Sequence, residues 1–247
     1  MYYIIAASLK ACYFPSVWKR ALVLAFPKPG KDPASPNYRP ISLLSILSKI
    51  YEGIIYSQIE LHVNTNNVII NEQFGFKPQH STVLQLLRVS EYFELEINKN
   101  RNSAMILLDI KRAFDSVWHK GLLYKLHLQQ LPVYLIKIVR DYLSDRSFAV
   151  SFQGELSSYL TVAAGIPQGS RLGPLLFNAF ANDIPRTTTT QLAVYADDTA
   201  VFTSSWSPTL LSHRLQSHVD TIIQYFSDWK MAINADKTEA ICFTRKH

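Results

Sequence analysis

The sequence predicts an α+β fold in which helices pack on one face of an antiparallel sheet. Residues 104–109 form a continuous apolar run ending in a carboxylate, which suits a strand buried on both faces. Two short apolar stretches flank Asp197 and Asp198 and indicate a hairpin with the acidic pair at its tip. Residues 208–231 carry apolar side chains at helical spacing, which predicts a long amphipathic helix.

Composition bounds the class of protein. The 247 residues are 48% hydrophobic and 18% charged, enough for one large domain or two small ones and too apolar for a disordered chain. No apolar run reaches about 18 residues, so we expect no transmembrane helix and no membrane partner. The N-terminus lacks a basic region before its apolar patch, which argues against a signal peptide. Cys12 and Cys242 form neither a disulfide framework nor a metal-ligand spacing and favour a reducing compartment.

The positive charge is concentrated at the N-terminus. The formal net charge is +6, and residues 1–49 hold seven basic residues against the single acid Asp32, so the rest of the chain is neutral. A basic segment on a neutral body suggests a polyanionic partner such as nucleic acid or nucleotide phosphates. An ordinary solvated basic surface is the alternative.

The N-terminal half predicts a loop and two helices. Residues 27–40 contain five prolines and three basic residues and predict an extended loop. Ser42 is a candidate cap for a helix, and a second helix is expected from Ser81 to Ile97. The apolar positions of the first helix are Leu43, Leu47, Ile50 and Ile54.

The C-terminal half predicts alternating helices and short strands. Residues 187–190, four threonines, predict a loop or the entry to a strand. The other expected elements, in chain order, are helices at 120–130 and 133–144, a hairpin of 147–152 with 155–162, a turn at 165–170, a helix at 173–182, strands at 191–195 and 199–203, the helix at 208–231 and a strand at 239–244.

Three aspartates stand out by context: Asp109 closes the buried strand, and Asp197 and Asp198 form the hairpin tip. Grouping buried carboxylates is costly because each raises the pKa of the others, and a divalent cation removes that cost. Carboxylate oxygens are preferred ligands of Mg²⁺, and two ions about 4 Å apart can promote phosphoryl transfer. The alternative is that aspartate simply favours turns, because spacing alone does not bring Asp109 to the hairpin.

Five motifs in order resemble the polymerase motifs of reverse transcriptases, over about residues 20–247. They are PKPGKDPASPNYRPISL (27–43), DIKRAF (109–114), GIPQGSRLGP (165–174), YADD (195–198) and NADKT (234–238). QFGFKPQHST at 73–82 and Trp118-His119 make the chain similar to the non-LTR retrotransposons, and to jockey-like LINE elements in particular.

This resemblance implies a fingers-and-palm fold with helices packed on an antiparallel palm sheet. Residues 1–100 would be mostly fingers and residues 101–247 mostly palm, with a fingers-like insertion near 126–160. Complete enzymes of this family continue into a thumb and often begin with an endonuclease, and we expect both to be absent from this chain.

The resemblance also implies a metal centre. Asp109 and Asp197 would be the main ligands of two Mg²⁺ ions, for which Mn²⁺ could substitute. Asp198 would complete the acidic cluster, and the backbone carbonyl of Ile110 would add a ligand. Lys237 resembles the lysine that protonates the leaving pyrophosphate, with a solvated surface lysine as the competing interpretation.

Other motif residues would bind the incoming dNTP. Phe114 would lie under the sugar and exclude a 2′-hydroxyl, with a core phenylalanine as the alternative. Gln168 and Gly169 would approach the base and the template strand, and the glycine permits close backbone approach. Lys28 and Arg39 resemble fingers residues that hold the triphosphate.

Two positions depart from the family pattern. Lys77 stands where many relatives have arginine, which would weaken a bidentate contact to the template or primer backbone. Arg171 occupies a position that is often apolar, which leaves the packing beside Gln168 less certain.

The resemblance therefore implies an RNA-directed DNA polymerase core of a non-LTR retrotransposon. Its partners would be an RNA template, a DNA primer, dNTPs and the other domains of the same polyprotein, and its place would be intracellular, in the nucleus and in cytoplasmic ribonucleoprotein. The alternative is a truncated, catalytically inactive RNA-binding remnant of the same fold. A two-metal nuclease would leave Phe114 and the 165–170 turn without a role, and RNA-dependent RNA polymerases usually carry a polar group at the position of Phe114.

Overall fold

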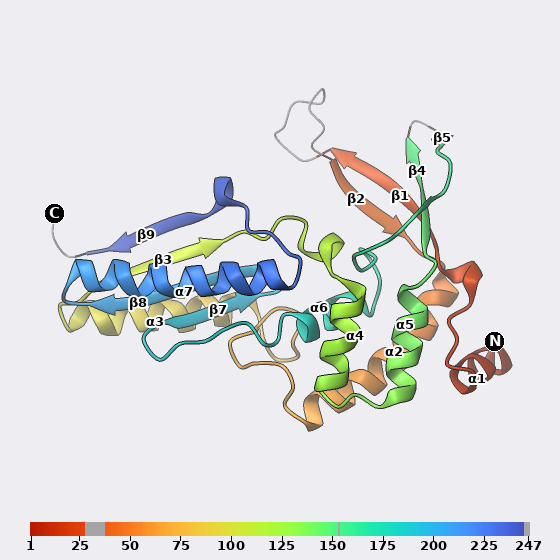
Figure 1. Cartoon of the computed structure of the whole chain (residues 1–247), viewed down its shortest axis with the longest axis horizontal. Helices are drawn as coiled ribbons and strands as arrows, with labels where there is room; N and C mark the ends of the chain where they lie inside the picture. The colour runs from red at the N-terminus through yellow and green to blue at the C-terminus, as the bar shows by residue number, and fades with distance from the viewer. Residues whose placement is uncertain (28–37, 153, 245–247) are drawn as a thin grey trace. The chain divides into compact units, whose positions relative to one another are not determined.

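The computed structural model describes residues 1–27, 38–152 and 154–244, and the chain forms two compact units (Figure 1). The first unit comprises Met1–Val68 and Phe114–Phe180, and the second comprises Ile69–Ala113 and Ala181–His247. The chain thus passes between the units three times.

The first unit contains a mixed sheet whose strands run in the order β2-β1-β4-β5, with β6 also paired to β4. β1 is antiparallel to β2 and parallel to β4, and β4 pairs antiparallel with β5 and β6. The expected hairpin is therefore confirmed, with its second strand divided in two. The strands are β1 (Arg20–Pro27), β2 (Tyr38–Leu43), β4 (Ser147–Phe152), β5 (Glu155–Leu156) and β6 (Leu160–Thr161).

The prediction of a helix cap at Ser42 is wrong. Ser42 lies in β2, opposite Val23 of β1, and Leu43 lies opposite Leu22. The helix begins at Ile46 after Ser45, which is its N-cap residue. Helix propensity alone would place Ser42 and Leu43 at the start of the helix. Their backbone pairing with β1 keeps them in a strand instead, because tertiary pairing overrides a weak local preference.

Helices build the rest of the first unit, and the expected helices at 120–130, 133–144 and 173–182 are confirmed within a few residues. Phe14, Tyr51 and Tyr142 are fully buried. The ring centroid of Phe14 lies 5.3 Å from that of Tyr51 and 5.0 Å from that of Tyr142. The helices are α1 (Tyr2–Lys10), α2 (Ile46–Thr65), α4 (His119–Leu128), α5 (Val133–Leu143) and α6 (Gly173–Phe180).

The second unit is built on an antiparallel sheet of strand order β7-β8-β3-β9 (Figure 1). All four strands were expected from the sequence. They are β3 (Asn102–Leu108), β7 (Gln191–Tyr195), β8 (Asp198–Ser205) and β9 (Glu239–Phe243). β8 is buried at every position after Asp198, so both of its faces are covered.

Helices α3 (Thr82–Asn98) and α7 (Pro208–Asp228) cover opposite faces of this sheet, which corrects the prediction of helices on one face (Figure 1). Phe93 of α3 packs against Ala193, Ala200 and Phe202 on one face. The side chains of β8 alternate, so Val201 points to the other face, where α7 lies. The prediction of helices on one face is wrong because the hydrophobic periodicity of a short apolar strand does not reveal whether that strand lies inside a sheet and is covered on both faces.

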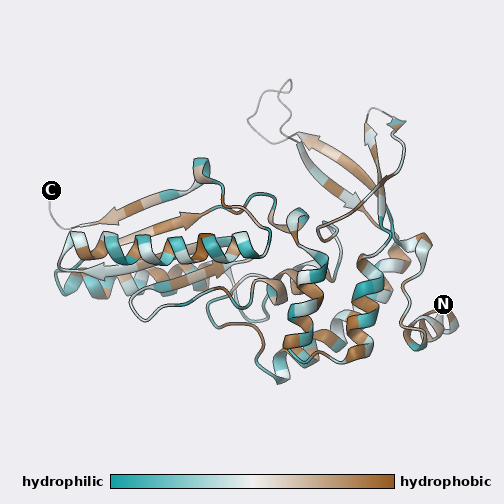
Figure 2. Cartoon of the chain, in the orientation of Figure 1, coloured by the Kyte–Doolittle hydropathy of each residue, from teal (hydrophilic) through white to brown (hydrophobic). Residues whose placement is uncertain are grey.

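Both helices begin at serine caps, as their sequences favour. Ser81 Oγ accepts a hydrogen bond from the Leu84 amide at 3.2 Å, and Ser207 Oγ accepts one from Leu210 at 3.3 Å. Polar and apolar residues alternate along α7, which fits one wet face and one packed face (Figure 2). Within the described residues, no helix is long and apolar enough to cross a bilayer.

Candidate functional site

The three aspartates lie at one end of the four-stranded sheet. Leu108, the last residue of β3, pairs with Thr199 of β8, and Asp109 follows it directly. Asp198 is the preceding residue on β8 and pairs with Tyr195 across the hairpin. Asp197 stands in the two-residue turn between them. The antiparallel register therefore brings the end of β3 beside the hairpin tip, which spacing alone left open.

The pKa of Asp197 reports this proximity. Burial raises the pKa of Asp197 above its ordinary value, and the charges of Asp198 and Asp109 raise it further, against a backbone hydrogen bond that lowers it. Like charges destabilise the ionised form of a neighbour only at short range. The three carboxylates therefore share one electrostatic environment, in which a cation would be favoured.

Asn234 and Lys237 hold Asp109 from the segment that precedes β9. The Asn234 side chain donates to Asp109 Oδ2 at 2.8 Å, and its backbone amide donates to the Asp109 carbonyl at 2.7 Å. Lys237 Nζ lies 3.7 Å from the same Oδ2 and is largely exposed. The NADKT motif contains both residues, but its resemblance to the family implies a role only for Lys237. The orienting role of Asn234 appears only in the fold.

Ile110 forms an isolated antiparallel bridge with Ile233. The two hydrogen bonds of this bridge are made by the residues on either side of Ile110 and Ile233. Lys111 N–H donates to the Ala232 carbonyl, and Asn234 N–H donates to the Asp109 carbonyl. In such a pair the carbonyl of Ile110 points away from Ile233, toward the side on which β3 pairs with β8. This orientation suits a backbone ligand beside the aspartates.

Among the described residues, no three acidic, histidine or cysteine side chains are arranged as a ready metal cluster. Mg²⁺ nevertheless usually binds proteins through one or two carboxylates, with water and substrate phosphates filling its other positions. The donor set of Asp109 and Asp197 fits such an ion, because burial and then the neighbouring negative charges raise the pKa of Asp197, and a cation would offset both effects.

Phe114 and the 165–170 turn form a second group of predicted residues, in the first unit. Ile166 N–H donates to the Phe114 carbonyl at 2.8 Å, and Gly165 N–H donates to Val117 at 2.9 Å. The ring of Phe114 stacks on Phe177 with centroids 4.6 Å apart. His119 Nε2 lies 2.7 Å from the Gly165 carbonyl. The GIPQGS turn is thus attached to the segment that follows DIKRA.

Gln168 and Gly169 lie on the outer part of this turn. Gln168 Nε2 donates to Asp115 Oδ1 at 2.9 Å. Gly169 has a φ of +88°, and a Cβ there would lie 3.0 Å from the Ser42 carbonyl oxygen. This position therefore requires glycine for its backbone conformation as well as for space.

Glu52 of α2 supports the same turn from within the unit. Its Oε2 accepts hydrogen bonds from the backbone amides of Arg171 at 2.8 Å and Leu172 at 3.4 Å, and its Oε1 accepts one from Ser48. Arg171, the departure from the family pattern, places its guanidinium over the Tyr56 ring instead of in the core. Glu52 was not singled out in the sequence because an acid inside an amphipathic helix gives no distinct signal.

The predicted basic residues are only partly described. Lys28 lies outside the described residues. Arg39 belongs to β2, opposite Phe26, and its side chain is not described. Lys77 belongs to the second unit and is half-buried.

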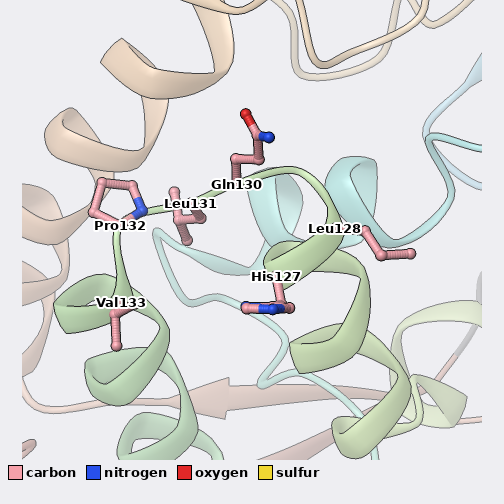
Figure 3. A pocket seen from close by; sticks show the side chains of 6 residues that line it. All are labelled: His127, Leu128, Gln130, Leu131, Pro132 and Val133. Carbon is pink, nitrogen blue, oxygen red and sulfur yellow. The ribbon is translucent and has the colours of Figure 1, made fainter.

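A shallow hollow at the connection between α4 and α5 contains none of the predicted site residues (Figure 3). His127, Leu128, Gln130, Leu131, Pro132 and Val133 line it. Its open, mostly apolar wall offers no acidic group to a metal ion.

Comparison with known proteins identifies the family. The profile described as "Reverse transcriptase (RNA-dependent DNA polymerase)" matches residues 26–246. The chain belongs to the reverse transcriptase family. The resemblance drawn from the five ordered motifs is therefore confirmed at the level of the family.

Several curated relatives of this reverse transcriptase domain come from jockey-like non-LTR elements, as expected. It is 41% identical over 244 residues to the RNA-directed DNA polymerase from mobile element jockey of Drosophila melanogaster, covering 95% of this chain and 26% of the relative. It is 36% identical over 249 residues to the probable RNA-directed DNA polymerase from transposon BS of the same species, covering 97% and 27%. The chain spans about a quarter of the length of these relatives.

Solved structures support the fold. A truncated apo telomerase from Candida tropicalis aligns with a TM-score of 0.66 at 14% identity, covering 93% of this chain and 51% of that one. A Candida albicans telomerase with a telomeric RNA fragment aligns with a TM-score of 0.59 at 12% identity, covering 100% and 46%. The α+β reverse transcriptase fold is thus confirmed.

Proposed function

We propose that this chain carries the nucleotidyl-transfer centre of an RNA-directed DNA polymerase of a non-LTR retrotransposon. The supporting observation is the convergence of Asp109 with the Asp197-Asp198 hairpin tip at one end of the sheet, where burial first, and then the charges of Asp198 and Asp109, raise the pKa of Asp197. The primer 3′-oxygen attacks the α-phosphorus of a dNTP. The new oxygen–phosphorus bond replaces the bond to the β-phosphate, and pyrophosphate leaves.

Asp109 and Asp197 would hold two Mg²⁺ ions, or Mn²⁺ in their place, with Asp198 and the Ile110 carbonyl as further ligands. When bound, the ions lower the pKa of the primer hydroxyl and neutralise charge on the pyrophosphate. Asn234 fixes one oxygen of Asp109 through its 2.8 Å hydrogen bond, which orients the other oxygen. The protein contributes chiefly positioning and electrostatics.

Lys237 would give a proton to the departing pyrophosphate. Its ammonium lies 3.7 Å from Asp109 and is largely exposed, so it can exchange this weak ion pair for a phosphate. Without bound nucleotide, the ammonium of Lys237 partly offsets the negative charge of Asp109.

Other motif residues would contact the nucleotide. Phe114 would exclude the 2′-hydroxyl, and Gln168 and Gly169 would approach the base and the template. Lys28 and Arg39 would hold the triphosphate. The support is the set of backbone hydrogen bonds that joins the Phe114 segment to the 165–170 turn.

We also propose the subdomain roles that the family implies. Residues 1–100, with the insertion near 126–160, would form mostly fingers, and the remainder would form mostly palm. An RNA template, a DNA primer, dNTPs and further domains of the same polyprotein would be the partners. The activity would be intracellular, in the nucleus and in cytoplasmic ribonucleoprotein.

Primer extension tests this proposal. Replacing a metal-binding carboxylate by an amide removes the ligand charge, so Asp197→Asn should lower incorporation of labelled dNTPs on a primed RNA template roughly 100-fold or more. Asp220→Asn on the exposed surface of α7, where Asp220 contacts only Gln216 in the described hydrogen bonds, is the matched control and should keep full activity. Because burial and like charges raise the pKa of Asp197, the melting temperature of Asp197→Asn should be equal or higher.

Near-normal extension by Asp197→Asn would overturn the assignment. RNA binding by the wild-type chain without any incorporation would instead favour the catalytically inactive RNA-binding remnant. The salt dependence of that binding would be steep, because phosphate contacts release counterions.

A further inference from the structure

We propose that Gln73 is a positioning residue for Asp197: its buried side-chain amide fixes the backbone of Ala196 and thereby sets where the Asp197 carboxylate lies. Gln73 belongs to the QFGF segment, whose motif indicates the family and no role for the glutamine. The inference rests on the proposed function for its catalytic consequence.

The Gln73 amide binds both backbone groups of one residue. Its Oε1 accepts a hydrogen bond from Ala196 N–H at 2.9 Å, and its Nε2 donates to the Ala196 carbonyl at 3.2 Å. The same Oε1 accepts a second bond from Gly75 N–H at 2.7 Å. Because Oε1 faces two donors and Nε2 faces an acceptor, the partners fix which way the amide points.

Ala196 is a residue whose conformation needs such support. Its φ is +59°, in the left-handed region that non-glycine residues adopt only at an energetic cost. The Ala196 carbonyl belongs to the peptide bond that links it to Asp197. Fixing both peptide planes of Ala196 therefore fixes the direction in which the Asp197 side chain leaves the turn.

The QFGF segment lies directly against the hairpin. A Cβ at Gly75 would lie 2.2 Å from the Ala196 nitrogen, so only glycine allows this approach. Phe74 N–H donates to the Val194 carbonyl at 2.9 Å, and Val194 N–H donates to Glu72 at 3.0 Å. These bonds make the segment a short parallel extension of the sheet beside β7.

Gln73 is 3% exposed, so the bonds that it makes to Ala196 are shielded from water. Water would not replace them efficiently if the side chain were removed, because buried polar groups left unpaired lose their hydrogen-bond energy outright. The left-handed Ala196 would then lose its support, and the turn would sample other conformations.

A second buried glutamine provides a matched control. Gln85 is 7% exposed, and its Nε2 donates to the carbonyls of Glu72 and Val194 at 3.0 and 3.1 Å. It therefore binds the same two segments through a buried amide. Its Oε1 accepts a further bond from Arg88 Nε at 3.0 Å, and its bonds to the hairpin end at Val194, two residues before Ala196, without touching the turn.

The test compares Gln73→Met with Gln85→Met in the whole chain. Both keep side-chain length and lose the amide. Hydrogen exchange of the Ala196 amide and the three-bond couplings that report the Asp197 χ1 angle are measured by NMR without metal. We expect Ala196 to exchange about 10- to 100-fold faster and Asp197 to average over rotamers in Gln73→Met only. Gln73→Glu keeps the acceptor for both N–H groups but sets an oxygen against the Ala196 carbonyl in place of the Nε2 donor, so it should retain part of the Ala196 protection and serves if Gln73→Met does not fold.

Primer extension supplies the kinetic comparison. Gln73→Met should lower kcat at least 10-fold with KM for dNTP within twofold, whereas Gln85→Met should change neither, at a temperature where both are folded. Equal Ala196 exchange and equal Asp197 couplings in the two variants would overturn the inference. An inactive wild type whose Asp197 rotamer still depends on Gln73 would refute the proposed function and leave the positioning role intact.

Discussion

Phe114 stacks on Phe177 at an interplanar angle of 22°, and its backbone carbonyl accepts the amide of Ile166. The half-buried ring is thus supported on one side by the 173–180 helix and joined through its backbone to the turn that carries Gln168. Packing of this kind fixes the ring's orientation, which a sugar gate requires.

Phe114→Ala should raise incorporation of rNTPs relative to dNTPs by roughly 10-fold or more, because the ring no longer excludes the 2′-hydroxyl. The ratio of kcat/KM for the two nucleotides measures this. Phe177→Leu removes the stacking partner that orients the ring but keeps the ring itself, and should therefore raise the ratio less than Phe114→Ala does. Unchanged sugar selectivity in Phe114→Ala would mean that Phe114 is a core residue only.

Among the elements, α3 is anchored at its C-terminal end by a charged cluster. Glu96 accepts hydrogen bonds from Lys99 and Arg101, both at 2.7 Å, and Arg101 lies over the Trp206 ring at 4.0 Å. Burial alone would raise the pKa of Glu96, but the hydrogen bonds and charges of Lys99 and Arg101 lower it below its ordinary value. The cluster connects the end of α3 to the turn after β8.

A lowered folded-state pKa means that the ionised Glu96 stabilises the fold above its unfolded pKa and that this stabilisation is lost as pH falls through the folded value. Glu96→Gln should lower the free energy of unfolding in urea by about 1–2 kcal/mol at pH 7. The difference from wild type should shrink below about pH 4. Glu94→Gln, on the exposed surface of the same helix, should show no such difference, and a pH-independent loss in Glu96→Gln would contradict the account.

Across the whole molecule, the apolar periodicity of the sequence predicts the elements whose formation depends mainly on nearby residues. The strands β7, β8 and β9 and the helix α7 were expected within a few residues, because their apolar periodicity is strong. Local pattern predicts no strand over residues 20–27 and predicts loop and helix over residues 38–43, because β1 pairs with β4, more than a hundred residues away, as well as with β2. No short-range signal encodes that pairing.

The candidate site divides in the same way. The three aspartates could be predicted, because a carboxylate at the end of an apolar strand and an acidic pair at a hairpin tip are visible in one dimension. Gln73 and Asn234 could not, since an amide acquires a positioning role only when the fold brings a particular backbone group within its reach. Sequence reasoning thus found the charged groups and missed the neutral ones that orient them.

Binding of Mn²⁺ to the wild-type chain, Asp109→Asn, Asp197→Asn and the double variant, measured by calorimetry, tests the central claim most directly. If the acids of β3 and the hairpin form one ion centre, each single change should weaken binding roughly 10-fold or more, and the double change should add little, because the two losses are strongly coupled. Full affinity in either single variant, or losses that add independently, would show that Asp109 and Asp197 do not share an ion.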